Sequence, residues 1–331
     1  MPTRGSSSLG AIDRRALHYF LTLARRGSLS AAAHDLGLSQ PSVSEIISRL
    51  EQRLGVKLLR RGPRGVSLTA AGRLLADEGG QIMRQLHALA ENVQSMGSRP
   101  TGFVSFAMPS SMGSRLAVPL AETVHLTMPG VQLHMTEAMS GVILDKLESE
   151  EIHLGCVLGP PDPAIFVSQP MFTEEMFLIT APDNWDDRIG ADGIAENPIS
   201  AEQLARLPLV LPRNSWGARR LIERNLAQVG QKLNVIMEID ALPHLMQVAA
   251  RASAYTLLPQ IAVVEEVAQG RLAMVRIGDV RMDRTAYLVR KRDRTPSRAM
   301  GVVQTLLGQI LQEVVTRHGL SLVCLPINPD L

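Results

Sequence analysis

Residues 28–55, SLSAAAHDLGLSQPSVSEIISRLEQRLG, decide the fold of the N-terminal part of this chain. They predict two short helices joined by a three-residue turn, residues 37–39, because glycine ends a helix and serine begins one. Pro41 suits the first turn of the second helix, where its missing N–H costs nothing. Four apolar residues of that helix share one face, as a buried stripe would: Val43, Ile47, Leu50 and Leu54. This arrangement is typical of a helix-turn-helix.

The other face of the second helix is polar. Ser39, Gln40 and Ser42 crowd its N-terminal end, the part of a recognition helix that usually meets base edges in the major groove. Small hydroxyl and amide side chains let the backbone come close to DNA and offer donors and acceptors to bases and phosphates. Alternatively, the serines only cap their own helix. That alternative stays open for Ser39 alone, but the whole set favours DNA binding.

The next segment, residues 56–69, predicts a strand, a Gly/Pro turn and a second strand, which form a small wing with arginines at its tip. Thr69 can cap the helix that follows. We therefore predict that this module binds double-stranded DNA. The predicted DNA-contacting residues are Ser28, Ser39, Gln40, Pro41, Ser42, Ser44, Glu45, Arg49, Arg61, Arg64 and Thr69.

The charge of the chain is divided unevenly. The net charge is +2, but residues 1–73 hold 12 Lys and Arg against 4 Asp and Glu, whereas the remainder holds 22 against 28. A basic end joined to an acidic body indicates that only one end meets a polyanion. The opening residues 1–12 contain no hydrophobic stretch and predict a flexible tail rather than a secretory signal.

Residues 70–97 predict a long helix with an apolar seam that repeats at steps of four and three. Its members are Leu75, Gly79, Ile82, Leu86, Leu89, Val93 and Met96. Three heptads of this kind favour a partner helix from a second chain, and hence a homodimer or homotetramer. Alternatively, this is an ordinary surface helix packed on its own domain.

Residues 102–331 alternate between strand-like and helical segments, which predicts an α/β fold of parallel sheets covered by helices. Two runs of similar length indicate two lobes: lobe I at about 102–171 and 277–331, and lobe II at about 172–276. The predicted organisation is a tail (1–12), a winged helix-turn-helix (13–69), a dimerising linker helix (70–97) and a two-lobed effector-binding domain (102–331).

Two loops of this body follow strands and precede helices, where hydroxyls and free N–H groups hold anions. The first loop carries Ser110 and Ser111, and the second carries Arg213, Asn214 and Ser215. Thr256, near the end of another strand, is a weaker third element. These six residues are the predicted effector-binding residues, and the predicted effector is a small metabolite with a carboxylate. Each loop could instead be a helix cap without a ligand.

No signature of an enzyme occurs in the sequence: there is no GxSxG, HExxH, P-loop or GxGxxG motif. The two cysteines are far apart, so no disulfide framework, metal site or cofactor is predicted. No apolar run is long enough to span a bilayer, so we expect a cytoplasmic protein without a membrane partner. The alternatives are a small-molecule-binding protein of the periplasmic type that merely carries a basic module, and an α/β enzyme.

Residues 20–75 resemble the DNA-binding region of LysR-type transcriptional regulators. The specific motifs are Gly27-Ser28, Ala31-Ala32, Ser39-Gln40-Pro41, Leu50-Glu51, Leu54-Gly55, Leu68-Thr69 and Ala71-Gly72. The rest of the chain resembles the same family more loosely, and most of all the members akin to the nitrogen assimilation control protein. The resemblance implies a winged helix-turn-helix, a dimerising linker helix, a domain like periplasmic binding proteins, and an effector between its lobes. RNA polymerase is a further candidate partner.

The sequence departs from the family pattern in two places. Glu45 and Ile46 stand where the family often has Arg and Gln, which puts a usual phosphate contact in doubt and favours a changed base preference. A glutamate in this place can accept a hydrogen bond from cytosine N4. Ala252 and Ala254 replace glycines that are common in the family, which predicts a stiffer turn there.

Overall fold

The computed structural model describes residues 11–62, 65–95, 99–213 and 218–328. The chain divides into two compact units, one up to Val93 and one from Gln94 onward. Within the described ranges, no helix is long and apolar enough to cross a membrane.

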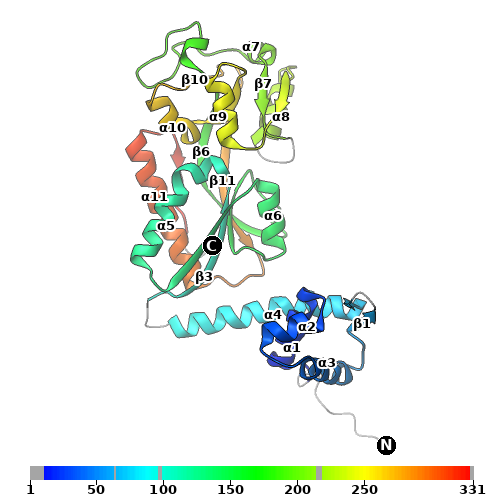
Figure 1. Ribbon diagram of the computed structural model, residues 1–331. Coiled ribbons are helices and arrows are strands. Elements are labelled where there is room, and N and C mark those ends of the chain that lie inside the picture. The colour runs from blue at the N-terminus through cyan, green and yellow to red at the C-terminus, as the bar shows by residue number, and fades with distance from the viewer. Residues whose placement is uncertain (1–10, 63–64, 96–98, 214–217, 329–331) are drawn as a thin grey trace, which may run out of the picture. The chain divides into compact units, whose positions relative to one another are not determined.

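The N-terminal unit contains three short helices, a two-stranded wing and a long helix. Its elements are α1 (Arg14–Arg26), α2 (Leu29–Leu36), α3 (Gln40–Leu54), β1 (Leu59–Gly62), β2 (Gly65–Leu68) and α4 (Ala70–Ser95) (Figure 1). Ser28 and Ser39 cap α2 and α3 by accepting the N–H of Ala31 and Ser42, and Gly37 ends α2 in the left-handed conformation. The predicted limits of these helices are confirmed.

The apolar stripe of α3 enters the core of the N-terminal unit. Val43, Ile47 and Leu50 are buried against Phe20 and Leu23 of α1, and Leu54 is partly buried. The opposite face of α3 stays accessible, as its polar residues predict. The wing strands pair antiparallel, with Leu59 opposite Leu68.

The predicted seam of α4 divides into two halves. Leu75 packs partly into the core of the N-terminal unit, and a Cβ at Gly79 would lie 2.5 Å from Cδ1 of Leu17. The first half of the seam therefore packs on its own unit, which corrects the prediction there. The second half is exposed and consists of Ile82, Leu86, Leu89 and Val93. Met96 lies outside the described residues.

Lobe I of the second unit is built on the parallel strands β3 (Gly102–Met108), β4 (Val131–Glu137) and β5 (Leu154–Leu158). Helices α5 (Ser110–Thr127) and α11 (Arg298–His318) cover one face of this sheet, and α6 (Ser140–Glu148) covers the other (Figure 1). Alternate residues of β3 account for the two faces: Phe106 packs with α5 and α11, whereas Ala107 packs with α6.

Lobe II consists of shorter elements around two further apolar cores. They are the 3₁₀ turn η2 (Pro182–Asn184), α7 (Ala201–Arg206), β7 (Leu209–Leu211), α8 (Ala218–Gln228), β8 (Val235–Glu238), α9 (Leu242–Ala250), β9 (Thr256–Pro259), α10 (Gln260–Ala268) and β10 (Ala273–Val275). Helix α10 contributes to both lobes, because Ile261 packs in the core of lobe I and Val263 in a core of lobe II.

Two long strands connect the lobes: β6 (Phe166–Thr180) and β11 (Asp283–Lys291). In the described part of the chain eight strands form one sheet, ordered β10-β6-β11-β5-β3-β4, with β9 and β12 (Val323–Cys324) also paired to β6. Strand β11 runs antiparallel to both β5 and β6, because it brings the chain back from lobe II after β6 has taken it there. The predicted parallel pairing is confirmed for β3 with β4 and β5 and for β7 with β8, but β11 makes the large sheet mixed rather than parallel throughout. The chain changes lobe within β6, so the predicted lobe limits remain our proposal.

Candidate functional site

The N-terminal end of α3 presents the hydroxyl and amide groups that the sequence singles out. The Ser39 and Ser42 Oγ atoms lie 2.8 Å apart, and Ser39 Oγ also accepts the Ser42 N–H at 3.3 Å. The Gln40 Oε1 accepts a hydrogen bond of 3.2 Å from Ser30 Oγ of α2. This contact holds the amide oxygen toward α2 and leaves the Gln40 NH₂ group available as a donor. Pro41 is exposed beside them.

One helical turn further along, Glu45 and Arg49 form an exposed ion pair, with 2.5 Å between Oε1 and Nη2. Both side chains are about two-thirds exposed, at 63% and 66%. Ser44, between the caps and this pair, is partly buried. The outward face of α3 thus runs from neutral donors and acceptors to a paired acid and base.

The remaining predicted DNA-contacting residues lie around this helix. Ser28 caps α2, while the Thr69 hydroxyl donates to Lys57 O and accepts the Gly72 N–H, so its role in the structure is that of a cap. Arg61 lies on β1, but the position of its side chain is not described, and Arg64 lies outside the described residues.

Glu51 belongs to the family motif Leu50-Glu51, but its role was not evident from the sequence. It is buried on α3, and its Oε1 accepts the N–H groups of Leu58 and Leu59 at 2.9 and 3.2 Å, while Lys57 Nζ lies 2.6 Å from Oε2. Burial alone would raise the pKa of Glu51, but the hydrogen bonds from Lys57, Leu58 and Leu59 outweigh it and lower the pKa. Glu51 therefore fixes the start of the wing to the recognition helix.

Replacing Glu51 by Gln is expected to destabilise the protein by about 1–3 kcal/mol, because a buried charge-assisted contact is lost. A depressed folded pKa stabilises the fold above the unfolded pKa, and this contribution disappears as the pH falls through the folded pKa. Urea unfolding measures the free energy of unfolding of both proteins. The difference between the wild type and Glu51→Gln should be smaller at acidic pH than at neutral pH. An equal loss in the free energy of unfolding at both pH values would contradict a stabilising role for the Glu51 carboxylate.

A cavity of about 550 Å³ lies between the two lobes. Lobe I supplies Ser140 and Leu144 of α6 and the end of β5 with the loop after it, and lobe II supplies α8. Strand β11 forms the remaining wall. The lining residues are Ser140, Leu144, Val157, Leu158, Gly159, Pro160, Arg220, Leu221, Arg224, Asp283, Arg284, Thr285 and Tyr287. Cavities of this size hold small molecules.

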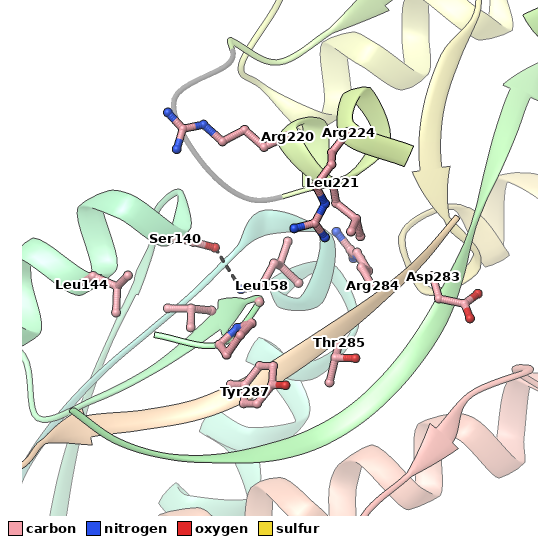
Figure 2. A pocket seen from close by; sticks show the side chains of 13 residues that line it. Ser140, Leu144, Leu158, Arg220, Leu221, Arg224, Asp283, Arg284, Thr285 and Tyr287 are labelled. Carbon is pink, nitrogen blue, oxygen red and sulfur yellow. Dashed lines mark hydrogen bonds between the residues drawn. The ribbon is translucent and has the colours of Figure 1, made fainter. Parts of the chain in front are cut away.

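Three arginines line this cavity: Arg220 and Arg224 from α8, and Arg284 from β11 (Figure 2). In Figure 2 the Arg224 side chain extends from α8 toward Arg284 of β11, whereas Arg220 points away from the other labelled side chains. Among the described residues, no carboxylate pairs with Arg224. Ser140 is already engaged, since its Oγ accepts the Leu158 N–H at 3.0 Å.

The described effector-binding residues predicted from the sequence do not line this cavity. Ser111 lies behind the cavity wall, where its Oγ accepts a hydrogen bond of 3.0 Å from Arg284 Nη2. Ser110 is partly buried in the first turn of α5 and does not line the cavity. Asn214 and Ser215 lie outside the described residues.

Two further predicted effector-binding residues, Arg213 and Thr256, do not line the cavity. Arg213 is 71% exposed and pairs with Asp240 at 2.8 Å, so a surface carboxylate already holds it. Thr256 is fully buried in lobe II and does not line the cavity. A side chain without any exposed surface cannot contact a ligand in this cavity, so the structure contradicts that prediction.

The two units together define a class of protein: a DNA-reading module joined to a two-lobed ligand-binding domain. Residues 14–73 match the model of the bacterial regulatory helix-turn-helix protein, lysR family, and residues 97–312 match the LysR substrate binding domain. The HTH-type transcriptional regulator BbuR of Bordetella bronchiseptica is 31% identical, over 93% of this chain and 92% of that regulator. The chain belongs to the LysR family of transcription regulators.

One further relative agrees with this assignment, and two solved structures have the same fold. The nitrogen assimilation regulatory protein nac of Klebsiella aerogenes is 26% identical, over 94% of this chain and 100% of that protein. A full-length OxyR variant from Pseudomonas aeruginosa has the same fold with a TM-score of 0.66 at 20% identity, covering 91% and 95% of the two chains. CbnR complexed with its target DNA has a TM-score of 0.60 at 19% identity, covering 92% and 100%.

Proposed function

We propose that this LysR-family regulator responds to a small organic anion bound between its two lobes. The observation that carries this proposal is the set of three arginines around one cavity, set against one lining carboxylate, Asp283. Asp283 is itself paired with Arg281, outside the cavity lining. Arg284 is likewise paired, with Glu174 behind the cavity wall. The field in the cavity therefore favours negative charge chiefly through α8, whose Arg224 has no carboxylate partner among the described residues.

The rest of the lining indicates the body of the ligand. Leu144, Val157, Leu158, Pro160 and Leu221 give the cavity an apolar wall, and Tyr287 adds an aromatic ring. Apolar walls with a few convergent polar groups are typical of ligand sites. A carboxylate with a compact aliphatic or aromatic body combines both features.

The remaining parts of the function follow from the family. We propose that α3 reads the operator and that the regulator works as a cytoplasmic homo-oligomer, as a regulator and not as an enzyme. RNA polymerase stays a candidate partner. An effector shifts such a regulator only when it binds one arrangement of the lobes more tightly than the other. A ligand that contacts both α8 and β11 meets this condition, since α8 belongs to lobe II and β11 connects the lobes.

The proposal predicts that organic monoacids such as benzoate and isovalerate bind, and that Arg224→Ala weakens this binding about 10- to 100-fold. One charge-assisted hydrogen bond contributes about 1.5–3 kcal/mol, which corresponds to that range. Isothermal titration calorimetry on the full chain measures the affinity, and a gel shift on the DNA upstream of its own gene measures the response.

Arg206→Ala is the matched control. Arg206 is an exposed arginine of the same lobe that pairs with Glu202 on α7, away from the cavity lining. The Arg206→Ala variant should bind benzoate and isovalerate with the affinity of the wild type. If the two variants were weakened equally, or if a panel of organic acids contained no binder, the cavity would not be an anion site.

A further inference from the structure

Arg284 takes part in a buried ion pair behind the wall of the cavity. Its Nε and Nη2 lie 2.7 and 2.6 Å from Glu174 Oε1, and the two side chains are only 4% and 1% exposed. Glu174 on β6 and Arg284 on β11 are direct cross-strand partners. Arg284 lines the cavity, whereas Glu174 does not. The pair therefore links the wall of the cavity to β6 and β11, the two strands that connect the lobes.

The carboxylate of this pair is only half satisfied. Both arginine nitrogens reach the same oxygen, Oε1, while Oε2 of Glu174 is buried with no hydrogen-bond partner among the described residues. A buried charged oxygen without a partner is costly. Burial raises the pKa of Glu174, and Arg284 offsets only part of that rise. Glu174 is thus a carboxylate that accepts a proton readily.

The guanidinium has one nitrogen left for a ligand. Nε and Nη2 bind Glu174, and Nη2 also donates to Ser111, while Nη1 has no hydrogen-bond partner within the described part of the chain. An anion at Nη1 would place a second negative charge on a guanidinium that already holds a buried carboxylate. Two carboxylates that share one site repel each other, which strongly raises one pKa.

We propose that Glu174 makes anion binding at Arg284 proton-linked: the anion binds together with one proton, which Glu174 takes up at its unpaired oxygen. The proton comes from solvent, no other bond changes, and Arg284 turns its charge from Glu174 to the ligand. Glu174 is in this respect a positioning residue, because it never touches the ligand. The inference rests on the anion site proposed above.

The other charged groups near the pair are engaged elsewhere or belong to the cavity. On α5 and α10, Arg115 pairs with Glu265 and Glu266, and next along β6, Glu175 pairs with Arg276. Neither set hydrogen bonds to Glu174. The other charged residues that line the same cavity as Arg284 are Arg220, Arg224 and Asp283. Glu174 is thus the carboxylate that would share the Arg284 guanidinium with a bound anion.

The sign of the pH dependence follows from this exchange. The occupied site has a higher Glu174 pKa than the empty site, so the ligand-bound protein holds more protons between the two pKa values. Affinity for the anion therefore falls as the pH rises through that window, by up to tenfold per pH unit. It is constant below and above the window.

The test uses the full chain and two probes, benzoate and isovalerate, which stay ionised at and above pH 6. Calorimetry in two buffers with different heats of ionisation should show uptake of up to one proton per bound anion. Glu174→Gln keeps the shape of the side chain but cannot take up the proton. It should bind both probes with an affinity that does not change with pH, and without proton uptake.

Glu175→Gln, the neighbouring residue at the surface, should behave like the wild type. Anion binding without proton uptake by the wild type would overturn the linkage and leave the proposed function intact. Absence of any anion binding by the wild type would overturn both. Should Glu174→Gln fail to fold, the proton count and the pH profile of the wild type alone decide the question.

Discussion

Changing Ser39, Gln40 and Ser42 together to alanine is expected to lower affinity for the operator by roughly 100-fold or more, while binding to unrelated DNA changes little. Each base-reading side chain contributes about 1–3 kcal/mol at the cognate site. Phosphate contacts supply most of the non-specific affinity, and the arginines that would make them remain. Fluorescence anisotropy with operator and scrambled duplexes measures both affinities.

The structure explains why these three residues should act as a set. Ser30 orients the Gln40 amide, and Ser39 and Ser42 hydrogen bond to each other at the same helix end. Because Ser39 also caps α3, its loss alone destabilises the helix by about 1 kcal/mol, so circular dichroism must show a folded variant. Gln52→Ala, exposed on the same helix about three turns away, is the control. Unchanged operator binding in the triple variant would mean that α3 does not read DNA through this end.

The parts of this fold that could be predicted from the sequence are those that local chemistry decides. Ser28, Gly37 and Ser39 cap and end helices through contacts within three or four residues, so α2 and α3 begin and end where the pattern indicates. The direction of β11 could not be predicted in this way. It depends on the chain returning from lobe II, which no local pattern records.

The residues of the cavity were also difficult to predict, because they come from segments that are far apart in the sequence. Strand-end serines are a local signal, and they identified Ser111 near the site but not its role as an acceptor for Arg284. Arg220 and Arg224 look like solvated helix residues in the sequence, and Glu174 stands in a strand 110 residues from Arg284. Only the pairing of β6 with β11 brings that acid and base together. A charged residue inside an apolar strand, such as Glu174, is the one signal that could have indicated a buried pair.

The exposed half of the α4 seam is a surface that a monomer would leave in water. Ile82, Leu86, Leu89 and Val93 are each between 41% and 59% exposed. Next to them lies an apolar groove of about 550 Å³ to which Ile12, Val56 and Leu74 also contribute. Contiguous apolar surface of this kind marks an interface. We expect the α4 helix of a second copy to cover it.

Replacing both Leu86 and Leu89 by Asp is therefore expected to convert the protein to monomers and to weaken operator binding by about 100-fold or more. The two charges would lie in an apolar interface without partners, which is strongly unfavourable. A monomer also loses the gain from binding two half-sites at once, which can exceed 100-fold. Sedimentation velocity measures the assembly, and anisotropy measures the affinity. Val229→Asp, which places a charge on another exposed apolar residue, at the end of α8, should remain oligomeric. A double variant that still sediments as a dimer would place the interface outside α4.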